Sequence, residues 1–382
     1  MDMLDASHAI PGTRDPETVL GLGPELVIVI PVLNEAANVA PLAARLRHVL
    51  GGVRWEAIWV DDGSSDGTRA NVAALGASDT RIRLIHRMGR KGLASACVEG
   101  AMASLAPVIA VMDGDLQHDE ALLPAMLDVL RAGRADVVIG SRYVEGGGNQ
   151  GLSARRARMS EFATRLSQLA TRVPVHDPMS GFFMLPRTVL ERAAPRLSAI
   201  GFKILLDVLA SLPTPPRVVE LPFRFRAREA GHSKLDTGVA FDFGLLLLDK
   251  LLGRLVPVRF VVFAAIGALG VLAHLAVLWV ALRAGLAFGP AQGTATAAAI
   301  AGNFALNNAI TFRDRRLKRW AALRGFATFA VACGFGALAN LNVAELMVNA
   351  GHGTWWAAGL VGAAMSLVWN YAVGSTLTWR RR

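Results

Sequence analysis

The arrangement of apolar and polar residues changes once along the chain. Up to about Leu235, short apolar runs alternate with charged loops, as in a water-soluble domain. Beyond Val258, long stretches of alanine, valine, leucine and glycine are almost free of charge. These stretches predict helices that cross a membrane, because one span of the bilayer needs about 20 apolar residues. The chain is therefore expected to join a soluble domain to a membrane domain.

Within the first part, apolar runs alternate with segments of helical spacing. The strands predicted from the runs are Leu26–Ile30, Trp55–Val60, Ile82–Ile85 and Val108–Met112, and the helices predicted between them are Ala36–Leu50, Thr68–Leu75 and Leu93–Ser104. This alternation indicates βαβ units and an α/β fold with a doubly wound, mostly parallel sheet. Ligands of such sheets bind beyond the carboxyl ends of the strands.

Composition and charge narrow the class of ligand. The 382 residues carry a formal net charge of +10, but much of it flanks apolar runs, where anionic lipid headgroups explain it better than nucleic acid. The glycine string Gly21–Leu26 precedes the first strand, which argues against a dinucleotide-binding domain, and the sequence has no P-loop. Residues 1–23 lack the pattern of a secretory signal and are expected to be a flexible leader to a cytoplasmic domain.

Three oxygen-bearing side chains follow the fourth predicted strand. Asp113, Asp115 and Gln117 alternate with Gly114 and an apolar residue, so one turn can direct them to the same side. Carboxylate and amide oxygens suit Mg²⁺ or Mn²⁺, which usually keep positions open for substrate phosphates. The alternative is that these residues only form a turn before the start of a helix. We expect that structural role for Asp119, as the helix cap, and for Glu120, beside the helix dipole.

Six motifs in a fixed order carry a resemblance to a known family. They are "PVLNE" (residues 31–35), "VDDGSSDGT" (60–68), "DGDLQH" (113–118), "GSRY" (140–143), "DPMSGF" (177–182) and "GHSKL" (231–235). Over residues 26–235 the chain resembles family-2 glycosyltransferases, and most of all the dolichyl or polyprenyl phosphate mannose synthases. The resemblance implies a glycosyltransferase-A type fold that binds a nucleotide sugar.

The resemblance also implies roles for residues of each motif. The predicted nucleotide-binding residues are Pro31, Leu33, Glu35, Asp61, Asp62, Asp113 and Ser233. The predicted metal ligands are Asp113, Asp115 and Gln117. The predicted acceptor-phosphate residues are Ser141, Arg142 and Arg156, with Arg155 as the alternative to Arg156. The predicted catalytic residues are Asp115, Arg142, Asp177, Arg228 and Lys234, with Asp177 expected to touch substrate. For Asp61 and Asp62 an Asx turn in "DDGSSDG" is the alternative.

The chemistry of this reaction agrees with the residue types. A phosphate monoester has a second pKa near about 6, so the acceptor is already a nucleophile at neutral pH and needs no general base. His86, His118 and His176 are accordingly expected to be structural or peripheral. Direct attack on the anomeric carbon predicts inversion, with the metal ion and Lys234 or Arg228 stabilising the departing nucleoside diphosphate.

Four apolar segments of the second part have the length of a membrane span. They are Val258–Leu282, Phe288–Phe312, Phe326–Val348 and Trp355–Thr378. Arginine and lysine gather after the second and fourth segments, which places both termini in the cytoplasm. The segments look like two copies of a helix pair, since Asn303 and Thr311 match Asn370 and Thr378, and the pattern resembles GtrA-like membrane proteins.

Two connecting stretches mix apolar faces with lysine and arginine, as helices at a membrane surface do. They are Arg155–Val173, for which a core helix is an equal alternative, and residues 237–257. The soluble domain is thus predicted to span residues 24–236 and the membrane domain residues 258–382.

The predicted function is transfer of mannose from GDP-mannose to dolichyl or polyprenyl phosphate, with Mg²⁺ or Mn²⁺. UDP-glucose or another UDP-sugar is the alternative donor. A processive polysaccharide synthase is disfavoured because the sequence has no Gln-x-x-Arg-Trp motif. A lipid-linked-sugar flippase with a nucleotide-sensing domain remains the alternative from a different class.

Overall fold

The protein forms two compact units that divide between Leu251 and Leu252. The computed structural model describes residues 23–89, 92–148, 164–198, 203–226, 237–252, 256–349 and 355–380. The predicted leader, residues 1–23, lies outside this part of the chain except for its last residue. Residues 237–251 group with the first unit, and the predicted boundaries of the soluble and membrane domains stay predictions.

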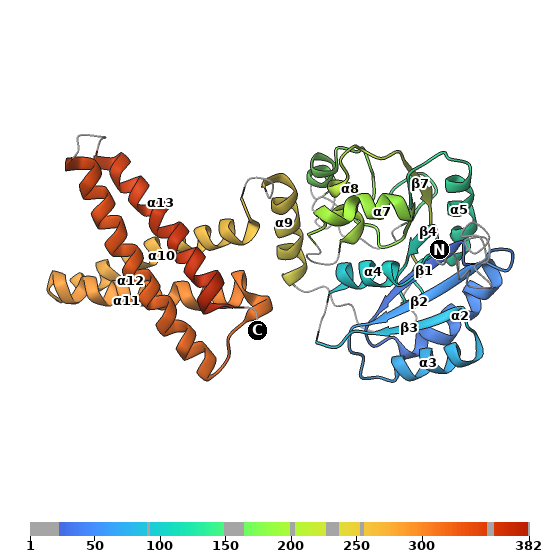
Figure 1. The fold of residues 1–382 in the computed structure, drawn as a ribbon, viewed down its shortest axis with the longest axis horizontal. Coiled ribbons are helices and arrows are strands. Elements are labelled where there is room, and N and C mark those ends of the chain that lie inside the picture. Colours follow the sequence, from blue (N-terminus) through green and yellow to red (C-terminus); the bar gives the residue numbers. More distant parts are fainter. Residues whose placement is uncertain are drawn as a thin grey trace, which may run out of the picture. The chain divides into compact units, whose positions relative to one another are not determined.

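A seven-stranded mixed sheet forms the first unit (Figure 1). Its strands are β1 (Leu26–Val32), β2 (Trp55–Asp61), β3 (Ile82–His86), β4 (Val108–Val111), β5 (Val137–Ser141), β6 (Phe183–Pro186) and β7 (Val218–Pro222). Their order is β3-β2-β1-β4-β6-β5-β7, and β6 runs antiparallel to both of its neighbours while the other pairs are parallel. The four predicted strands are confirmed to within two residues at each end.

Helices cover both faces of this sheet, which explains why β1 is apolar throughout and why β2 is apolar except at Glu56 and Asp61. The helices of the first unit are α2 (Ala36–Val49), α3 (Thr68–Ser78), α4 (Leu93–Met102), α5 (Leu123–Arg131), α7 (Arg187–Ala193), α8 (Ile204–Ser211) and α9 (Thr237–Leu252), with short 3₁₀ turns η1 (Glu120–Leu122) and η2 (Ala194–Arg196). Ile28 and Ile30 pack with α2, α3 and α5, whereas Val27 and Val29 pack with α4, α7 and α8. A strand buried on both faces is apolar at nearly every position.

The reversed direction of β6 determines which loops share one edge of the sheet. The carboxyl ends of the six parallel strands lie at that edge, and so does the amino end of β6, because β6 pairs antiparallel with β4 and β5. Residues 177–182, which lead into β6, therefore reach the edge where the loops after β1, β2, β4 and β5 begin. The sequence motifs are brought together by this arrangement.

Helix α9 packs on the first unit through α8. Leu246 and Leu247 of α9 pack against Leu206, and the same cluster includes Leu166 from the helical residues 164–171. Buried Asp207 of α8 and Lys250 of α9 form an ion pair at 2.5 Å. The described parts of both stretches expected at the membrane surface thus share one apolar cluster with α8, and their contact with a bilayer stays a prediction.

The second unit consists of helices. They are α10 (Val258–Arg283), α11 (Phe288–Leu306) continued by the π-helical turn η3 (Asn307–Thr311), the 3₁₀ turn η4 (Arg313–Arg315), α12 (Trp320–Asn349), and α13 (Trp355–Val373) continued by the π-helical turn η5 (Gly374–Thr378). Among the described residues, three stretches are long and apolar enough to cross a membrane: 258–283, 320–339 and 360–378. A fourth helix, α11, lies where the remaining span is predicted, but glutamine, threonine and glycine make it less apolar.

The internal duplication is visible in the helix pairs α10–α11 and α12–α13 (Figure 1). Asn303 of α11 lies against Gly270 of α10, and Asn370 of α13 lies against Gly336 of α12. Both pairs end in a π-helical turn, and the aromatic residues that follow these turns, Phe312 and Trp379, stack with ring centroids 4.3 Å apart. The two copies therefore repeat the same contacts as well as the same sequence pattern.

Candidate active site

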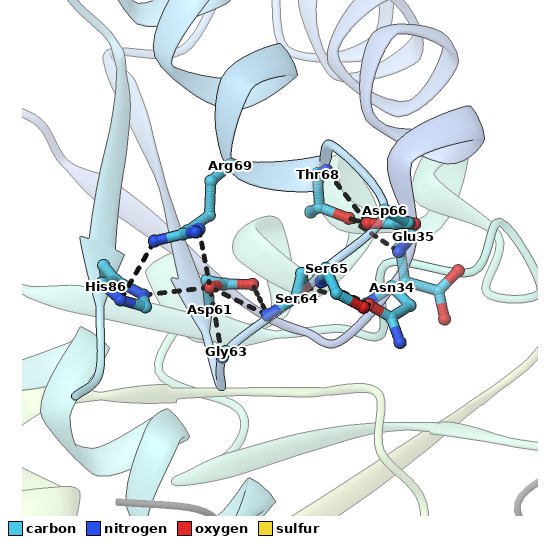
Figure 2. A network of polar contacts seen from close by, with 10 residues as sticks. All are labelled: Asn34, Glu35, Asp61, Gly63, Ser64, Ser65, Asp66, Thr68, Arg69 and His86. Carbon is cyan, nitrogen blue, oxygen red and sulfur yellow. Dashed lines mark hydrogen bonds and ion pairs between the residues drawn. The ribbon is translucent and has the colours of Figure 1, made fainter. Parts of the chain in front are cut away.

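The loops after β1 and β2 are joined by hydrogen bonds (Figure 2). The backbone N–H of Asn34 donates to Ser64 Oγ at 2.8 Å, and the Asn34 side-chain oxygen accepts from the Ser65 N–H at 2.9 Å. The backbone N–H of Glu35 donates to Thr68 Oγ1 at 2.9 Å. These bonds fix the predicted nucleoside-binding loop, including Leu33 and Glu35, beside the end of β2.

Asp61 is fully buried at the end of β2 and is held by its own turn. Its carboxylate accepts from the N–H groups of Gly63 and Ser64 and contacts His86 Nδ1 at 3.1 Å (Figure 2). An arginine can only donate, so His86 Nε2 accepts from Arg69 at 3.1 Å and Nδ1 carries the proton. Burial would raise the pKa of Asp61, but these hydrogen bonds outweigh it and keep the pKa below its usual range. The Asx-turn alternative is what the structure contains, and contact with a base stays a prediction.

Asp62 has a different set of partners, which organise the loop after β3. Its carboxylate accepts from Arg87 at 2.6 Å and from the N–H of Gly92 at 2.7 Å. Arg87 is buried and also donates to Glu99 and Ser95. The two neighbouring aspartates therefore order two separate loops at the predicted nucleoside end of the site.

The predicted metal loop follows β4 directly and depends on a close backbone approach. A Cβ at Gly114 would lie 2.7 Å from Val32 Cγ1, so only glycine fits between the two aspartates here. Leu116 is buried and has a φ of 63°, a left-handed conformation that leucine rarely adopts. This strained residue lies between Asp115 and Gln117, in the same loop as Asp113.

His118 holds the backbone at the first of these aspartates. The Asp113 N–H donates to His118 Nδ1 at 3.0 Å, which leaves the proton on Nε2, 3.7 Å from Asp113 Oδ2. The imidazole is buried and stacks on Phe182 with ring centroids 5.2 Å apart. Burial lowers the pKa of His118, so the ring is neutral at pH 7. His118 therefore positions Asp113, in agreement with the structural role expected for it.

The donor set of this loop fits a hard divalent cation. Desolvation raises the pKa of Asp113, and the nearby Asp115 carboxylate acts in the same direction. A bound cation would offset the repulsion between these two carboxylates. The Gln117 side-chain nitrogen donates to the carbonyl of Arg226 at 3.0 Å, so the oxygen of the same amide can take an acceptor role. Within the described residues no group of three or more His, Cys, Asp or Glu side chains forms a metal site. A set of two carboxylates is nevertheless typical of Mg²⁺ sites that substrate phosphates complete.

Arg226, which follows β7, holds the far end of the same loop. Its guanidinium binds Asp119 and Glu120 at 2.7 Å each, and its backbone N–H donates to the Gln117 carbonyl at 3.0 Å. Asp119 also accepts from the N–H of Ala121, which confirms the predicted helix cap. The ion pairs with Arg226 were not predicted.

Arg142 stands just beyond β5 and is oriented by a buried carboxylate. Asp177 is fully buried and accepts from Arg142 Nε and Nη2, both at 2.8 Å, in a bidentate pair. Glu220 of β7 in turn accepts from the backbone N–H groups of His176 and Asp177. Ser141, the last residue of β5, is buried, and its Oγ accepts weakly from the Tyr143 N–H at 3.4 Å.

The same geometry shows what Asp177 contacts within the protein. Both of its carboxylate oxygens are occupied by Arg142, and its side chain is closed to solvent. A carboxylate in that position orients the guanidinium and keeps it charged. Asp177 therefore orients Arg142 in this structure, and its contact with the substrate stays a prediction.

Lys203, which precedes α8, lies near these residues and was not predicted from the sequence. Its Nζ donates to the Met179 carbonyl at 3.4 Å, and it interacts electrostatically with Arg142, Asp177 and Asp113. Burial, with Arg142 acting in the same direction, lowers the pKa of Lys203 to about 8. No motif marks this lysine, because it stands alone before an apolar helix.

The structure thus brings most of the predicted site residues to one edge of the sheet. Pro31, Leu33, Glu35, Asp61, Asp62, Asp113, Asp115, Gln117, Ser141, Arg142 and Asp177 all lie at or just beyond the strand ends described above. Arg156, Arg228, Ser233 and Lys234 lie outside the described residues. The roles of both groups stay predictions.

Comparison with known proteins first defines the class. The family model "Glycosyl transferase family 2" matches residues 27–193, and the model "GtrA/DPMS, transmembrane domain" matches residues 262–379. The first unit therefore has the fold of a family-2 glycosyltransferase, and the second is a membrane domain. The α/β fold and the all-helical membrane part expected from the sequence are confirmed.

Individual relatives narrow the family further. A dolichol-phosphate mannosyltransferase of Pyrococcus furiosus is 33% identical over 359 residues, which cover 92% of this chain and 98% of that protein. A dolichol-phosphate mannosyltransferase of Saccharomyces cerevisiae is 35% identical over 57% of this chain and 84% of its own length. The polyprenol monophosphomannose synthase of Mycolicibacterium smegmatis is 35% identical over 59% of this chain and 89% of its own length. The chain belongs to the dolichol-phosphate mannosyltransferase family.

Proposed function

We propose that the protein transfers mannose from GDP-mannose to the phosphate of dolichyl or another polyprenyl phosphate, with inversion at the anomeric carbon. The observation that carries this proposal is that two groups lie at the same edge of the sheet, the carboxylates Asp113 and Asp115 and the buried Asp177 paired with Arg142. The same chain also has a membrane domain. Similarity over nearly the whole length of the Pyrococcus relative supports it. The site would serve a charged donor and a charged acceptor at once.

The donor end of the site is formed by the loops after β1, β2 and β4. Pro31, Leu33 and Glu35 would line the nucleoside pocket, with Asp61 and Asp62 ordering its walls or contacting the base. Mg²⁺ or Mn²⁺, held by Asp113, Asp115 and Gln117, would neutralise the diphosphate and stabilise the charge that develops on the leaving group. Ser233, Lys234 and Arg228 would add positive charge and hydrogen bonds to the same phosphates.

At the acceptor end, Arg142 would hold the lipid phosphate in line with the anomeric carbon. Ser141 and Arg156 would complete this grip. One phosphate oxygen forms the new bond to the anomeric carbon while the bond from that carbon to the donor phosphate breaks. The attacking group is a dianion with a second pKa near about 6, so no residue needs to remove a proton. Attack from the face opposite the leaving group produces the inverted sugar phosphate.

The experiment that tests this function uses the purified full-length protein in detergent or lipid nanodiscs. Labelled GDP-mannose, Mg²⁺ or Mn²⁺ and polyprenyl phosphate are expected to give a labelled lipid and GDP, and chelation of the metal is expected to stop the reaction. Parallel reactions with UDP-glucose separate the two donor classes. If no nucleotide sugar gave a lipid-linked product, the enzyme function would be wrong, and polymeric product would indicate a polysaccharide synthase.

We further propose that the membrane domain crosses the bilayer four times, with the soluble domain and both termini in the cytoplasm. The turn of the α10–α11 pair is short, so α11 must return the chain to the side where α10 began. Residues 313–319 carry five positive charges between the helix pairs, whereas residues 284–287 and 350–354 carry no formally charged group. Positive loops stay on the cytoplasmic side.

Single cysteines test this topology in a background where Cys97 and Cys333 are replaced by alanine. In intact cells an impermeant maleimide is expected to label Gly285→Cys but not Lys318→Cys. After lysis it is expected to label both. Labelling of Lys318→Cys in intact cells would contradict the proposed orientation.

A further inference from the structure

The acceptor side of the site contains a second cation that has no assigned role. Lys203 is placed rigidly, because the helix that it precedes is buried almost throughout, including Ile204, Leu205 and Val208. The backbone carbonyl of Lys203 accepts the first helical hydrogen bond, from Asp207 at 3.1 Å. Its ammonium group reaches the Met179 carbonyl in the loop that leads into β6. A flexible surface lysine would have neither constraint.

The charges around this ammonium group come from three separate loops. Asp113 after β4 and Asp177 before β6 attract it, and Arg142 after β5 repels it. Asp177 is already bonded through both oxygens to Arg142. Holding two cations in one partly buried region is unfavourable, and an anion that enters between them removes this cost.

We propose that Lys203 binds the acceptor phosphate together with Arg142. This inference rests on the proposed function. A phosphate dianion has three acceptor oxygens, so it can accept hydrogen bonds from the Arg142 guanidinium on one side and from the Lys203 ammonium group on another. Lys203 also attracts the Asp113 carboxylate, so its charge would reduce the repulsion between that carboxylate and the incoming phosphate. Lys203 would therefore contribute to binding of the acceptor phosphate and not to binding of the nucleotide sugar.

The alternative is that Lys203 only ties its helix to the Met179 carbonyl. Lys203→Gln separates these roles, because the amide keeps a hydrogen-bond donor and loses the charge. We expect Lys203→Gln and Lys203→Met to lower kcat/KM for polyprenyl phosphate by about 10- to 100-fold, in the range of a lost charge-assisted contact, with the KM for GDP-mannose within about twofold of wild type. Lys203→Arg is expected to restore a large part of the activity.

Arg217→Met provides the matched control. Arg217 lies beside the amino end of β7, at the edge of the sheet opposite the site, and pairs with Asp136. Its replacement removes one positive charge from the protein and is expected to leave both KM values unchanged. Thermal unfolding of each variant shows whether the fold is intact, and Lys203→Arg keeps the test valid if the other variants unfold.

The outcomes distinguish this inference from the function on which it rests. An inactive wild-type protein would contradict the proposed function itself. An active wild-type protein with unchanged acceptor kinetics in Lys203→Gln would overturn the role of Lys203 alone. A rise in the KM for GDP-mannose with an unchanged acceptor KM would also overturn it, because the lysine would then serve the donor.

Discussion

Replacement of Asp115 by alanine is expected to lower the rate of lipid-linked product formation by about 1,000-fold or more. Asp115 is buried at the end of β4, and its charge acts on Asp113 at the same turn. Without it, the site would lose a ligand of the divalent cation and the means to neutralise the leaving diphosphate. The rate is measured with labelled GDP-mannose and polyprenyl phosphate, and Mn²⁺ binding is measured directly by calorimetry.

Asp128→Ala is the control for this substitution. Asp128 lies on α5 with 66% of its side chain exposed, so its loss changes the net charge equally and is expected to leave product formation unchanged. Intact synthesis in Asp115→Ala would show that the metal ligands are assigned to the wrong residues. Normal Mn²⁺ binding with lost synthesis would instead assign Asp115 a role toward the substrate alone.

Asp177→Asn is expected to lower kcat/KM for polyprenyl phosphate by about 100-fold. The substitution would let Arg142, and the phosphate that it holds, move out of position, and a displacement of about 1 Å has an effect of that size. The amide can accept only one of the two hydrogen bonds that Arg142 now donates to the carboxylate. The guanidinium would lose its fixed orientation while its charge remains. Steady-state kinetics at varied acceptor concentration measure the change, and the KM for GDP-mannose is expected to stay constant.

A double-mutant cycle decides how Asp177 acts. If it works only through Arg142, the double variant Asp177→Asn with Arg142→Met is no less active than Arg142→Met alone. Additive losses would mean that Asp177 touches the substrate, as the sequence motif suggested. Asp136→Asn is the matched control, since Asp136 forms a similar fork with Arg217 at the opposite edge of the sheet and is expected to have wild-type kinetics.

The sequence predicted those parts of the fold that repeat a simple pattern. β1 and β2 are buried on both faces, so their apolar runs, interrupted only by Glu56 in β2, mark them as central strands. Each run ends in polar residues, and parallel strands bring such ends to one edge. Strand pattern alone was therefore enough to predict that Asp113 and Asp115 lie at the same sheet edge as Asp61.

Features that depend on long-range contacts could not be predicted in the same way. The direction of β6 follows from its pairing with β4 and β5, which a four-residue strand does not encode. Lys203 and Arg226 belong to no motif and gain their positions from α8 and from the chain after β7. The pairing of buried Asp177 with Arg142 likewise depends on long-range contacts, which the motif alone does not reveal.

The order of the site residues along the chain has a consequence for how such enzymes diverge. All the described residues assigned to the donor precede residue 118, and those assigned to the acceptor phosphate follow residue 140, with α5 and the turn at Gly133 between them. On the proposed roles, the nucleoside and the metal ion are bound by the earlier part of the sheet and the acceptor phosphate by the later part, whereas Arg228, Ser233 and Lys234 would reach the donor phosphates from the chain after β7. Selection for a new lipid can act on the later part while the nucleotide pocket in the earlier part is inherited unchanged.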